Sequence, residues 1–311
     1  MKVGFLGFGE VASTLSVGLM KNGAEVYTCV KGRSTRTRNN ILKSGVETYP
    51  SYKALAENSD IIISSVVPSE AIEVAEMVGK YSSGIYVDIN NVSPKTVVNA
   101  LYMIENGKTV DAAIIGSVAK NGIDVKVIAS GYCANEFADL NHYGMNITVV
   151  GGLNGQASGI KLLRSSYTKG VSALLFESIY HAYKMGIDRE VLKYISETEC
   201  PDFIESAKSR IISAAYHAQR RSEEMDEVVE MLSGKQDPIM ARGTMDFFRM
   251  LGEDIKKPEK RPVEYNEIFE YLMKIKEWFV YVICGFCPLK LIFINFKFNE
   301  HKYMIDIKVR G

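Results

Sequence analysis

The sequence has 311 residues, enough for one large or two ordinary domains, and its 37 basic side chains balance 37 acidic ones. A balanced charge argues against a strong field directed at nucleic acid or a membrane surface, and we expect neither as a partner. The five cysteines are scattered, and the N-terminus leads straight into a strand instead of a signal peptide. These features predict a cytoplasmic protein with reduced thiols.

The first twelve residues predict a nucleotide-binding turn. Lys2–Leu6 has the pattern of a buried strand and Glu10–Lys21 that of a helix, with Gly7-x-Gly9-x-x-Ala12 between them. Such glycines permit a tight turn and a close approach of backbone to a pyrophosphate, which then meets the N–H groups of the helix N-terminus. We expect the cofactor to contact Gly7, Phe8, Gly9, Glu10 and Val11.

The segment after the second strand, residues 24–30, predicts which dinucleotide binds. An acid at this point would accept hydrogen bonds from a ribose 2′-OH, but residues 31–38 are KGRSTRTR and contain no acid. Arg33 and Ser34, with Arg36 nearby, are best placed to hold a 2′-phosphate. This favours NADP over NAD, and the alternative is a solvated basic loop.

Two further strands end in segments that suit a ligand. The first is the β-branched run 60–67, whose end supplies Val66, Val67 and Pro68 as a wall for the cofactor. The second, residues 84–89, is followed by short polar side chains. We expect Asn90 to contact the cofactor and Asn91 and Ser93 the substrate; ordinary loop capping is the alternative.

The remaining pattern predicts a doubly wound α/β domain followed by an all-helical domain. Strand-like runs at 108–114, 126–130 and 146–150 complete the sheet, and a long helical pattern then covers 156–184. Further helical patterns follow at 188–196, 204–218, 220–231 and 238–251. We predict a dinucleotide-binding domain at 1–150, a helical domain at 151–255, and a linker with a C-terminal extension of doubtful structure at 256–311.

These motifs resemble those of the β-hydroxyacid dehydrogenase superfamily, which includes 6-phosphogluconate and 3-hydroxyisobutyrate dehydrogenases. The resemblance rests on the glycine turn and on the segments 88–94 (DINNVSP), 111–117 (DAAIIGS) and 159–161 (GIK). The segment 161–170 resembles a branch whose C-terminal domain has no assigned substrate. The resemblance implies that Lys161 is the general acid/base, since a lysine removed from water has a lowered pKa and can exchange a proton. It also implies a homodimer.

The sequence departs from the family pattern at three positions, and two of them, Ile115 and Ser165, are substrate contacts in the family. Ile115 stands where the family has a serine, Ser117 replaces a glycine, and Ser165 replaces an asparagine. Helical spacing places Lys161, Arg164, Ser165 and Thr168 on one face, which suits an anionic substrate. The expected substrate contacts are Asn91, Ser93, Gly116, Ser117, Arg164, Ser165 and Thr168.

Other polar clusters are weaker indications of a functional site. Arg210, His217, Arg220 and Arg221 form a second basic group on helical segments. The four histidines have no ligand spacing, and Cys284 and Cys287 lack a second pair, so no metal site is expected. Residues 256–262 have the composition of a linker. The segment after them is a true appendage, a strand pair added to a dimer, or an extension without selected structure, and we favour the last or a poorly ordered segment.

The function that we predict is NADP-dependent hydride transfer between nicotinamide and a small anionic β-hydroxyacid or its semialdehyde. One alternative is an NADP(H)-binding sensor or scaffold without turnover, which the altered residues Ile115 and Ser165 motivate. The other is an enzyme of the same fold that reduces imines.

Overall fold

A computed structural model of the chain describes residues 1–199, 202–233, 237–255, 261–275, 291–299 and 302–310. The contacts divide the chain into two compact units. Unit 1 comprises Met1–Tyr167 with Glu227–Asp237, and unit 2 comprises Thr168–Asp226 with Pro238–Gly311. The division falls inside two helices, α8 (Gln156–Lys184) and α11 (Ala218–Leu232), whose residues from Glu227 onward belong to unit 1. The domain ranges derived from the sequence stay a prediction.

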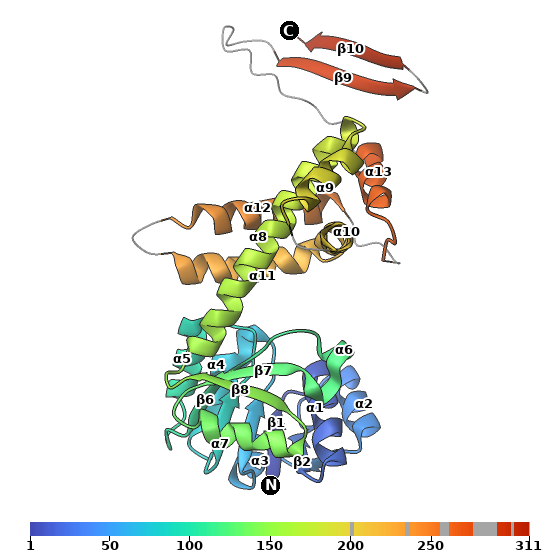
Figure 1. Ribbon diagram of the computed structural model, residues 1–311. Helices are drawn as coiled ribbons and strands as arrows, with labels where there is room; N and C mark the ends of the chain where they lie inside the picture. The colour runs from blue at the N-terminus through green and yellow to red at the C-terminus, as the bar shows by residue number, and fades with distance from the viewer. Residues whose placement is uncertain (200–201, 234–236, 256–260, 276–290, 300–301, 311) are drawn as a thin grey trace. The chain divides into compact units, whose positions relative to one another are not determined.

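Unit 1 contains an eight-stranded sheet with the order β3-β2-β1-β4-β5-β6-β7-β8 (Figure 1). All neighbours pair parallel except β6 and β7, which pair antiparallel. The order reverses between β1 and β4, which makes this pair the switch point of the sheet. The strands are β1 (Lys2–Leu6), β2 (Glu25–Cys29), β3 (Glu47–Tyr49), β4 (Ile61–Ser64), β5 (Ile85–Asp88), β6 (Thr109–Ile114), β7 (Lys126–Ser130) and β8 (Asn146–Gly151).

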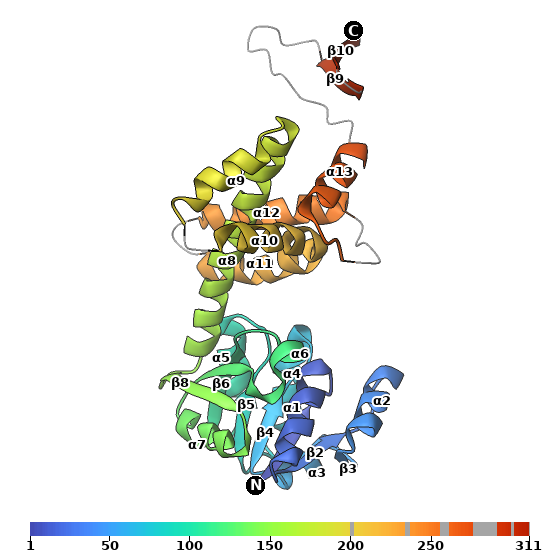
Figure 2. The ribbon, with the colours of Figure 1, turned by 45° about the vertical axis from the view of Figure 1, so that its right-hand side comes forward.

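Helices cover both faces of this sheet, because alternate strand residues enter two separate hydrophobic clusters. Val3 and Phe5 of β1 pack with α1, α6 and α7, whereas Leu6 packs with α3, α4 and α5 (Figure 2). The helices of this unit before α8 are α1 (Glu10–Lys21), α2 (Thr35–Ser44), α3 (Tyr52–Glu57), α4 (Ala71–Gly79), α5 (Pro94–Tyr102), α6 (Val118–Asn121) and α7 (Ala134–Ala138), with short 3₁₀ helices at Pro68–Glu70, Gly122–Asp124 and Asp139–Tyr143.

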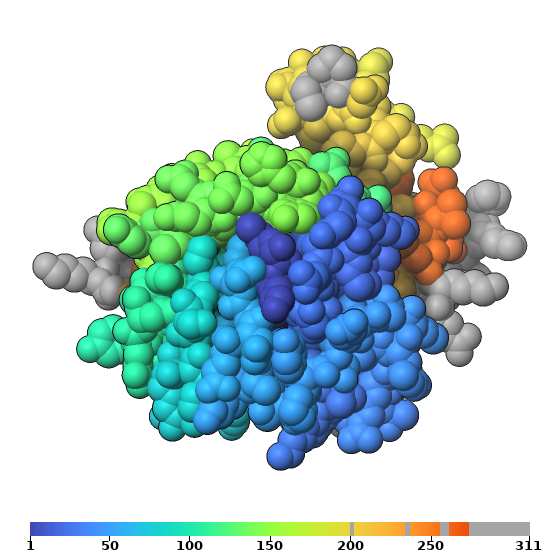
Figure 3. All heavy atoms as spheres, turned by 90° about the horizontal axis from the view of Figure 1, so that it is seen from below, coloured from blue at the N-terminus to red at the C-terminus, as the bar shows by residue number. Residues whose placement is uncertain are grey.

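Figure 3 shows the edge of the sheet at which the strand β1 begins. The dark-blue start of β1 lies there between later segments of the unit, as its pairing with β2 and β4 requires. The nucleotide turn lies at the other end of β1.

The predicted fold class is confirmed, and the differences are local. The basic segment 31–38 is not a loop throughout, since the helix α2 begins within it at Thr35, where Ser34 caps it: the Ser34 hydroxyl accepts a hydrogen bond from Thr37 N at 3.3 Å. The strand β7 runs antiparallel to β6. The direction of β7 depends on the path of the chain between β6 and β7, and local hydrophobicity does not predict that path.

Unit 2 is helical and has its own core. Phe176 lies at its centre, with ring centroids 5.1 Å from Phe269 and 5.7 Å from Phe247. The helices after α8 are α9 (Asp188–Ser196), α10 (Phe203–Tyr216), α11 (Ala218–Leu232), α12 (Ile239–Asp254) and α13 (Tyr265–Ile275).

The C-terminal extension contains a strand pair, which was one of the alternatives for it. Two antiparallel strands, β9 (Leu291–Asn299) and β10 (Lys302–Arg310), lie in this extension, for which we favoured no selected structure or a poorly ordered segment. Most of the predicted linker, residues 256–260, lies outside the described residues, as do Cys284 and Cys287. Within the described ranges, no helix has both the length and the apolar character needed to cross a membrane.

Candidate functional site

The glycine turn lies at the switch point of the sheet. Gly7 has φ +84°, and a Cβ there would lie 2.2 Å from the carbonyl oxygen of Ser65, which follows β4. Gly9 faces open space, since a Cβ there would meet nothing within 4 Å. Only glycine therefore fits at Gly7, and the backbone at Gly9 is open to a ligand.

The N-terminus of α1 next to this turn has no side-chain cap, so the N–H groups of its first turn receive no side-chain acceptor. Ala12 is fully buried, which lets α1 pack closely on the sheet. Phe8 is buried, Val11 is half-buried and Glu10 is exposed. An open, uncapped helix N-terminus beside a glycine turn suits the pyrophosphate of a dinucleotide.

The basic loop follows β2 on the same edge of the sheet. Arg33 is half-buried, and Ser34 and Arg36 are exposed. The Nη2 atom of Arg33 is buried and has no hydrogen-bond partner among the described residues. The Ser34 hydroxyl is engaged in capping α2. Arg33 is thus a half-buried residue of this loop whose guanidinium has an N–H donor group without an acceptor among the described residues.

The segments after β4 and β5 are tied together by Asn90. Its Oδ1 accepts from Val66 N at 2.7 Å, and its Nδ2 donates to Asp88 Oδ2 at 2.9 Å and to Ser64 Oγ at 3.2 Å. Asn90 is only 5% exposed. Its amide therefore shapes the wall made by Val66 and the exposed Val67 and Pro68.

The carboxyl group of Asp88 is fully buried in this network. Both of its oxygens accept hydrogen bonds from Asn90, at 2.9 Å from the backbone N and 2.9 Å from Nδ2. Burial nevertheless raises the pKa of Asp88 from 3.8 to about 7, against the opposing effect of these hydrogen bonds.

The two residues after this network have different surroundings. Asn91 is half-buried. Ser93 is 1% exposed and caps α5, its hydroxyl accepting from Thr96 N at 3.2 Å. The capping role that we weighed for Ser93 is therefore present, and a substrate contact there stays a prediction.

The start of α8 is anchored to the sheet by a buried carboxylate, Asp111 of β6. Its Oδ2 accepts from Gly155 N and Ser158 N, each at 3.0 Å, and its Oδ1 accepts from Ser158 Oγ at 2.6 Å. Ser130 Oγ donates to the same carboxylate at 3.3 Å and accepts from Ala157 N at 3.0 Å. An internal anion thus satisfies the N–H groups that open the helix.

This anchor fixes the turn of α8 that carries Lys161. The helix passes close to the segment after β5, because a Cβ on Gly159 would lie 3.7 Å from Pro94 Cγ. Lys161 follows two residues later and is half-buried. Its backbone therefore lies near the carboxyl edge of the sheet, the edge that also carries the glycine turn.

The remaining predicted substrate residues fall into two groups. On α8, Arg164 is exposed, Ser165 is half-buried, and the half-buried Thr168 is the first residue of unit 2. After β6, Ile115 packs on a small apolar cluster, Gly116 has φ +130°, and Ser117 is exposed. Ser117 and Lys161 both belong to unit 1, whereas Thr168 does not.

The second basic group lies in unit 2. Arg221 Nη2 donates to Ser213 Oγ at 3.0 Å, and its Cζ lies 5.3 Å from the ring centroid of Phe248. Burial lowers the pKa of Arg221 to about 10. Arg220 Nε lies 3.7 Å from Glu224, which also pairs with the buried Lys169 at 2.9 Å. These contacts give the group a packing role within the helical unit.

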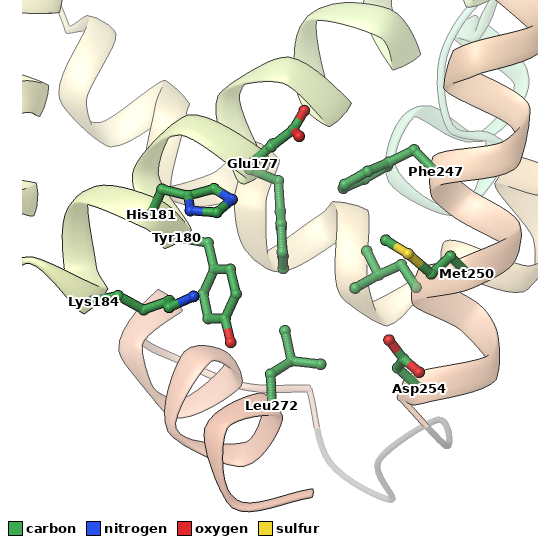
Figure 4. Close-up of a pocket in the computed structure, with 10 residues that line it drawn as sticks. Glu177, Tyr180, His181, Lys184, Phe247, Met250, Asp254 and Leu272 are labelled. Atoms are coloured by element: carbon green, nitrogen blue, oxygen red, sulfur yellow. The ribbon is translucent and has the colours of Figure 1, made fainter. Parts of the chain in front are cut away.

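Unit 2 also contains a cavity of about 130 Å³ between α8, α12 and α13. Figure 4 shows Tyr180, Phe247 and Leu272 around it, with Glu177, His181, Lys184 and Asp254 also among its lining residues. It lies outside the unit that carries the glycine turn. In the described ranges of the chain, no group of three or more His, Cys, Asp or Glu side chains is placed to hold a metal ion.

Sequence reasoning missed two contributors to this site. Asp111 was noted as part of a motif but not as the anchor of α8, and Tyr52, whose ring contacts Arg33, was not noted at all. An acid in a buried strand is the signal that could have identified Asp111 as an anchor. No local signal pointed to Tyr52.

Comparison with known proteins identifies two relatives that match most of this chain. An uncharacterized 28.5 kDa protein in the 7S RNA 5′ region of Methanothermus fervidus is 45% identical over 254 residues, which are 81% of this chain and 100% of that protein. The solved structure of the conserved protein MTH1747 of unknown function is 47% identical, with a TM-score of 0.75, over 81% of this chain and 97% of that one. That structure is described as similar to 3-hydroxyacid dehydrogenases.

Family models match two parts of the chain. Residues 2–92 match a family described as NADP oxidoreductase, coenzyme F420-dependent, and residues 182–251 match a domain of unknown function, DUF1932. A 3-hydroxyisobutyrate dehydrogenase of Mycobacterium tuberculosis shares the fold, with a TM-score of 0.70 at 12% identity over 87% of this chain and 98% of that one. The two-part architecture is thus common to these proteins.

Proposed function

Since the chain belongs to the β-hydroxyacid dehydrogenase superfamily and has the fold of its nucleotide-dependent oxidoreductases, we propose that it is an NADP-dependent enzyme. Its substrate is a small anionic β-hydroxyacid or the matching semialdehyde, and Lys161 is the general acid/base. The observation that carries this proposal is the packing of α8 at Gly159 against Pro94. This packing supports a lysine near the edge at which the glycine turn lies.

The chain's own residues suit the cofactor. Gly7 and Gly9 leave room for a pyrophosphate, and the uncapped start of α1 offers N–H groups to it. Arg33 has a buried guanidinium nitrogen without a partner among the described residues, which supports a phosphate at the 2′ position of the ribose. The family description for residues 2–92 names NADP, in agreement with this choice.

The bound nicotinamide supplies or accepts the hydride. Lys161 moves a proton at the substrate oxygen: it accepts the hydroxyl proton during oxidation and returns it to the carbonyl oxygen during reduction. The anchor at Asp111 holds the start of α8, so the lysine keeps one position along the sheet edge. Arg164, exposed one turn further on, binds the carboxylate of the substrate, and Asn91, Ser117 and Ser165 complete the proposed contacts of this unit.

The test is a panel of hydroxyacids and semialdehydes with NADP⁺ or NADPH, followed by the absorbance of the reduced nicotinamide. Coenzyme F420 is included as a hydride donor or acceptor, because the matched family description names it. On any active substrate, Lys161→Ala lowers kcat by about 10²–10⁴-fold while NADPH binding is retained. The matched control is Lys43→Ala, an exposed lysine at the end of α2, which keeps wild-type turnover.

Three outcomes contradict parts of the proposal. Unchanged turnover in Lys161→Ala removes the lysine assignment. Tight NADPH binding without turnover of any substrate supports a sensor, the alternative that Ile115 and Ser165 suggest. Reduction of imines in place of semialdehydes replaces the proposed substrate class.

A further inference from the structure

Arg33 is fixed at both of its backbone polar groups. Its N–H donates to the carbonyl oxygen of Val30 at 3.2 Å, and its own carbonyl oxygen accepts from Arg38 Nε at 2.9 Å. The next residue, Ser34, caps α2. The start of the Arg33 side chain is therefore held in one place.

The guanidinium of Arg33 lies over an aromatic ring. Its Cζ is 5.1 Å from the ring centroid of Tyr52, and its Nη2 is buried without a hydrogen-bond acceptor in the described part of the chain. Within those same ranges, no acid forms an ion pair with this arginine. The positive charge is thus held by the face of a ring and is not neutralised by a carboxylate.

Tyr52 is itself anchored. It is the first residue of α3, and the preceding Ser51 caps this helix by accepting from Ala54 N at 3.1 Å. The half-buried ring packs against the hydrophobic cluster that contains Leu55 and Ala56 of the same helix. A ring on the first turn of a capped, packed helix is a rigid platform.

We propose that Tyr52 is a positioning residue that determines the choice of dinucleotide, by holding the Arg33 guanidinium ready for the 2′-phosphate of NADP. The inference rests on the proposed function. An arginine that is already ordered loses less conformational freedom when the phosphate binds, so its ring support strengthens binding without touching the ligand. The guanidinium N–H groups that remain unpaired suit phosphate oxygens, and NADH offers no such group at this position.

The test compares the Kd values of NADPH and NADH, measured by the fluorescence of the reduced nicotinamide. Tyr52→Leu weakens NADPH binding by about three- to tenfold and leaves NADH binding unchanged, since only NADPH uses Arg33. Tyr52→Phe keeps the ring and therefore keeps the NADPH preference. Arg33→Ala removes the preference altogether, and adding Tyr52→Leu to it has no further effect.

Tyr81→Leu is the matched control, because this tyrosine also contacts cations, with Lys53 Nζ and Lys80 Nζ each 5.0 Å from its ring centroid. It keeps the wild-type ratio of the two Kd values. Equal weakening of NADPH and NADH by Tyr52→Leu, or the same loss in the Arg33→Ala background, overturns the positioning role. If the leucine variant does not fold, Tyr52→Met supplies the same comparison.

The two proposals fail in different ways. A wild-type chain that binds NADPH and NADH equally well, with no effect of Arg33→Ala, contradicts the cofactor choice and overturns the role of Tyr52 with it. A wild-type preference for NADPH that depends on Arg33 but survives Tyr52→Leu overturns the role of Tyr52 alone.

Discussion

Ionisation of Asp88 destabilises the folded state. Burial raises its pKa from 3.8 to about 7, so the folded chain holds a proton on Asp88 that the unfolded chain has already released between these pH values. When the folded state binds a proton that the unfolded state does not, the free energy of unfolding falls as the pH rises through this window. The cost of ionised Asp88 is therefore absent below about pH 4 and complete above about pH 7.

Asp88→Asn is predicted to remove this dependence. Relative to the wild type, the free energy of unfolding of the variant rises by on the order of 1 kcal/mol per pH unit between pH 4 and pH 7 and then becomes constant. Urea unfolding at a series of pH values measures the difference. The exposed Asp139→Asn is the control, and its curve runs parallel to that of the wild type. A difference that is independent of pH contradicts the assignment to Asp88.

At the scale of one element, α8 depends on an acceptor that another strand supplies. Asp111→Ala leaves Gly155 N and Ser158 N without the carboxylate that accepts from them at 3.0 Å. We expect the free energy of unfolding to fall by about 3 to 5 kcal/mol, because buried donors lose a charged acceptor. Ser158→Ala, which removes one donor and leaves the carboxylate in place, costs about 1 to 2 kcal/mol.

Chemical denaturation measures both losses. The control is Asp124→Ala, an exposed acid whose carboxylate accepts from Asn146 Nδ2 at 3.2 Å. A loss for Asp111→Ala no greater than that of the control would show that the carboxylate does not anchor the helix.

The elements themselves are largely predictable, because each is encoded locally. The strand Ile61–Ser64 begins with three isoleucines and lies buried on both faces of the sheet, and the turn at Gly7 needs a residue without Cβ. The last strands β9 and β10 matched only one of several alternatives and not the favoured one, since an apolar run interrupted by Lys290 and Pro288 has no clear period.

The contacts that shape the site are harder to predict, because they join distant positions. Asp111 meets Ser158 across 47 residues, and Asn90 meets Val66 across 24. Neither partner has a sequence pattern that names the other. The sequence thus identifies side chains that are capable of binding or catalysis. The packing of the folded chain determines which of them form structural hydrogen bonds instead.

At the scale of the whole chain, two large hydrophobic clusters pack on the sheet and another forms the core of the helical unit within the described residues. Val3 and Leu6 of β1 belong to the first two, and Phe176 of α8 belongs to the third. Two helices, α8 and α11, run from one unit into the other along the chain. Because the cores share few side chains, we expect the units to unfold as distinct cooperative transitions.

The dinucleotide is predicted to stabilise only one of these transitions. NADPH at about 100 times its Kd adds about 2.7 kcal/mol to a unit that binds it when folded, a shift of roughly 5 to 10 °C for a unit of this size. Scanning calorimetry with and without NADPH should show that shift in the transition of unit 1 and none in that of unit 2.

Gly7→Ala tests whether the glycine turn is the source of the shift. A Cβ at this position lies 2.2 Å from Ser65 O, so the turn must move and the NADPH-dependent shift is lost. Gly45→Ala is the matched control, since Gly45 also has a left-handed φ of +72° but faces open space. It lowers the midpoint of unit 1 through backbone strain yet keeps the shift. A shift that survives Gly7→Ala, or that appears equally in unit 2, places the dinucleotide elsewhere in the chain.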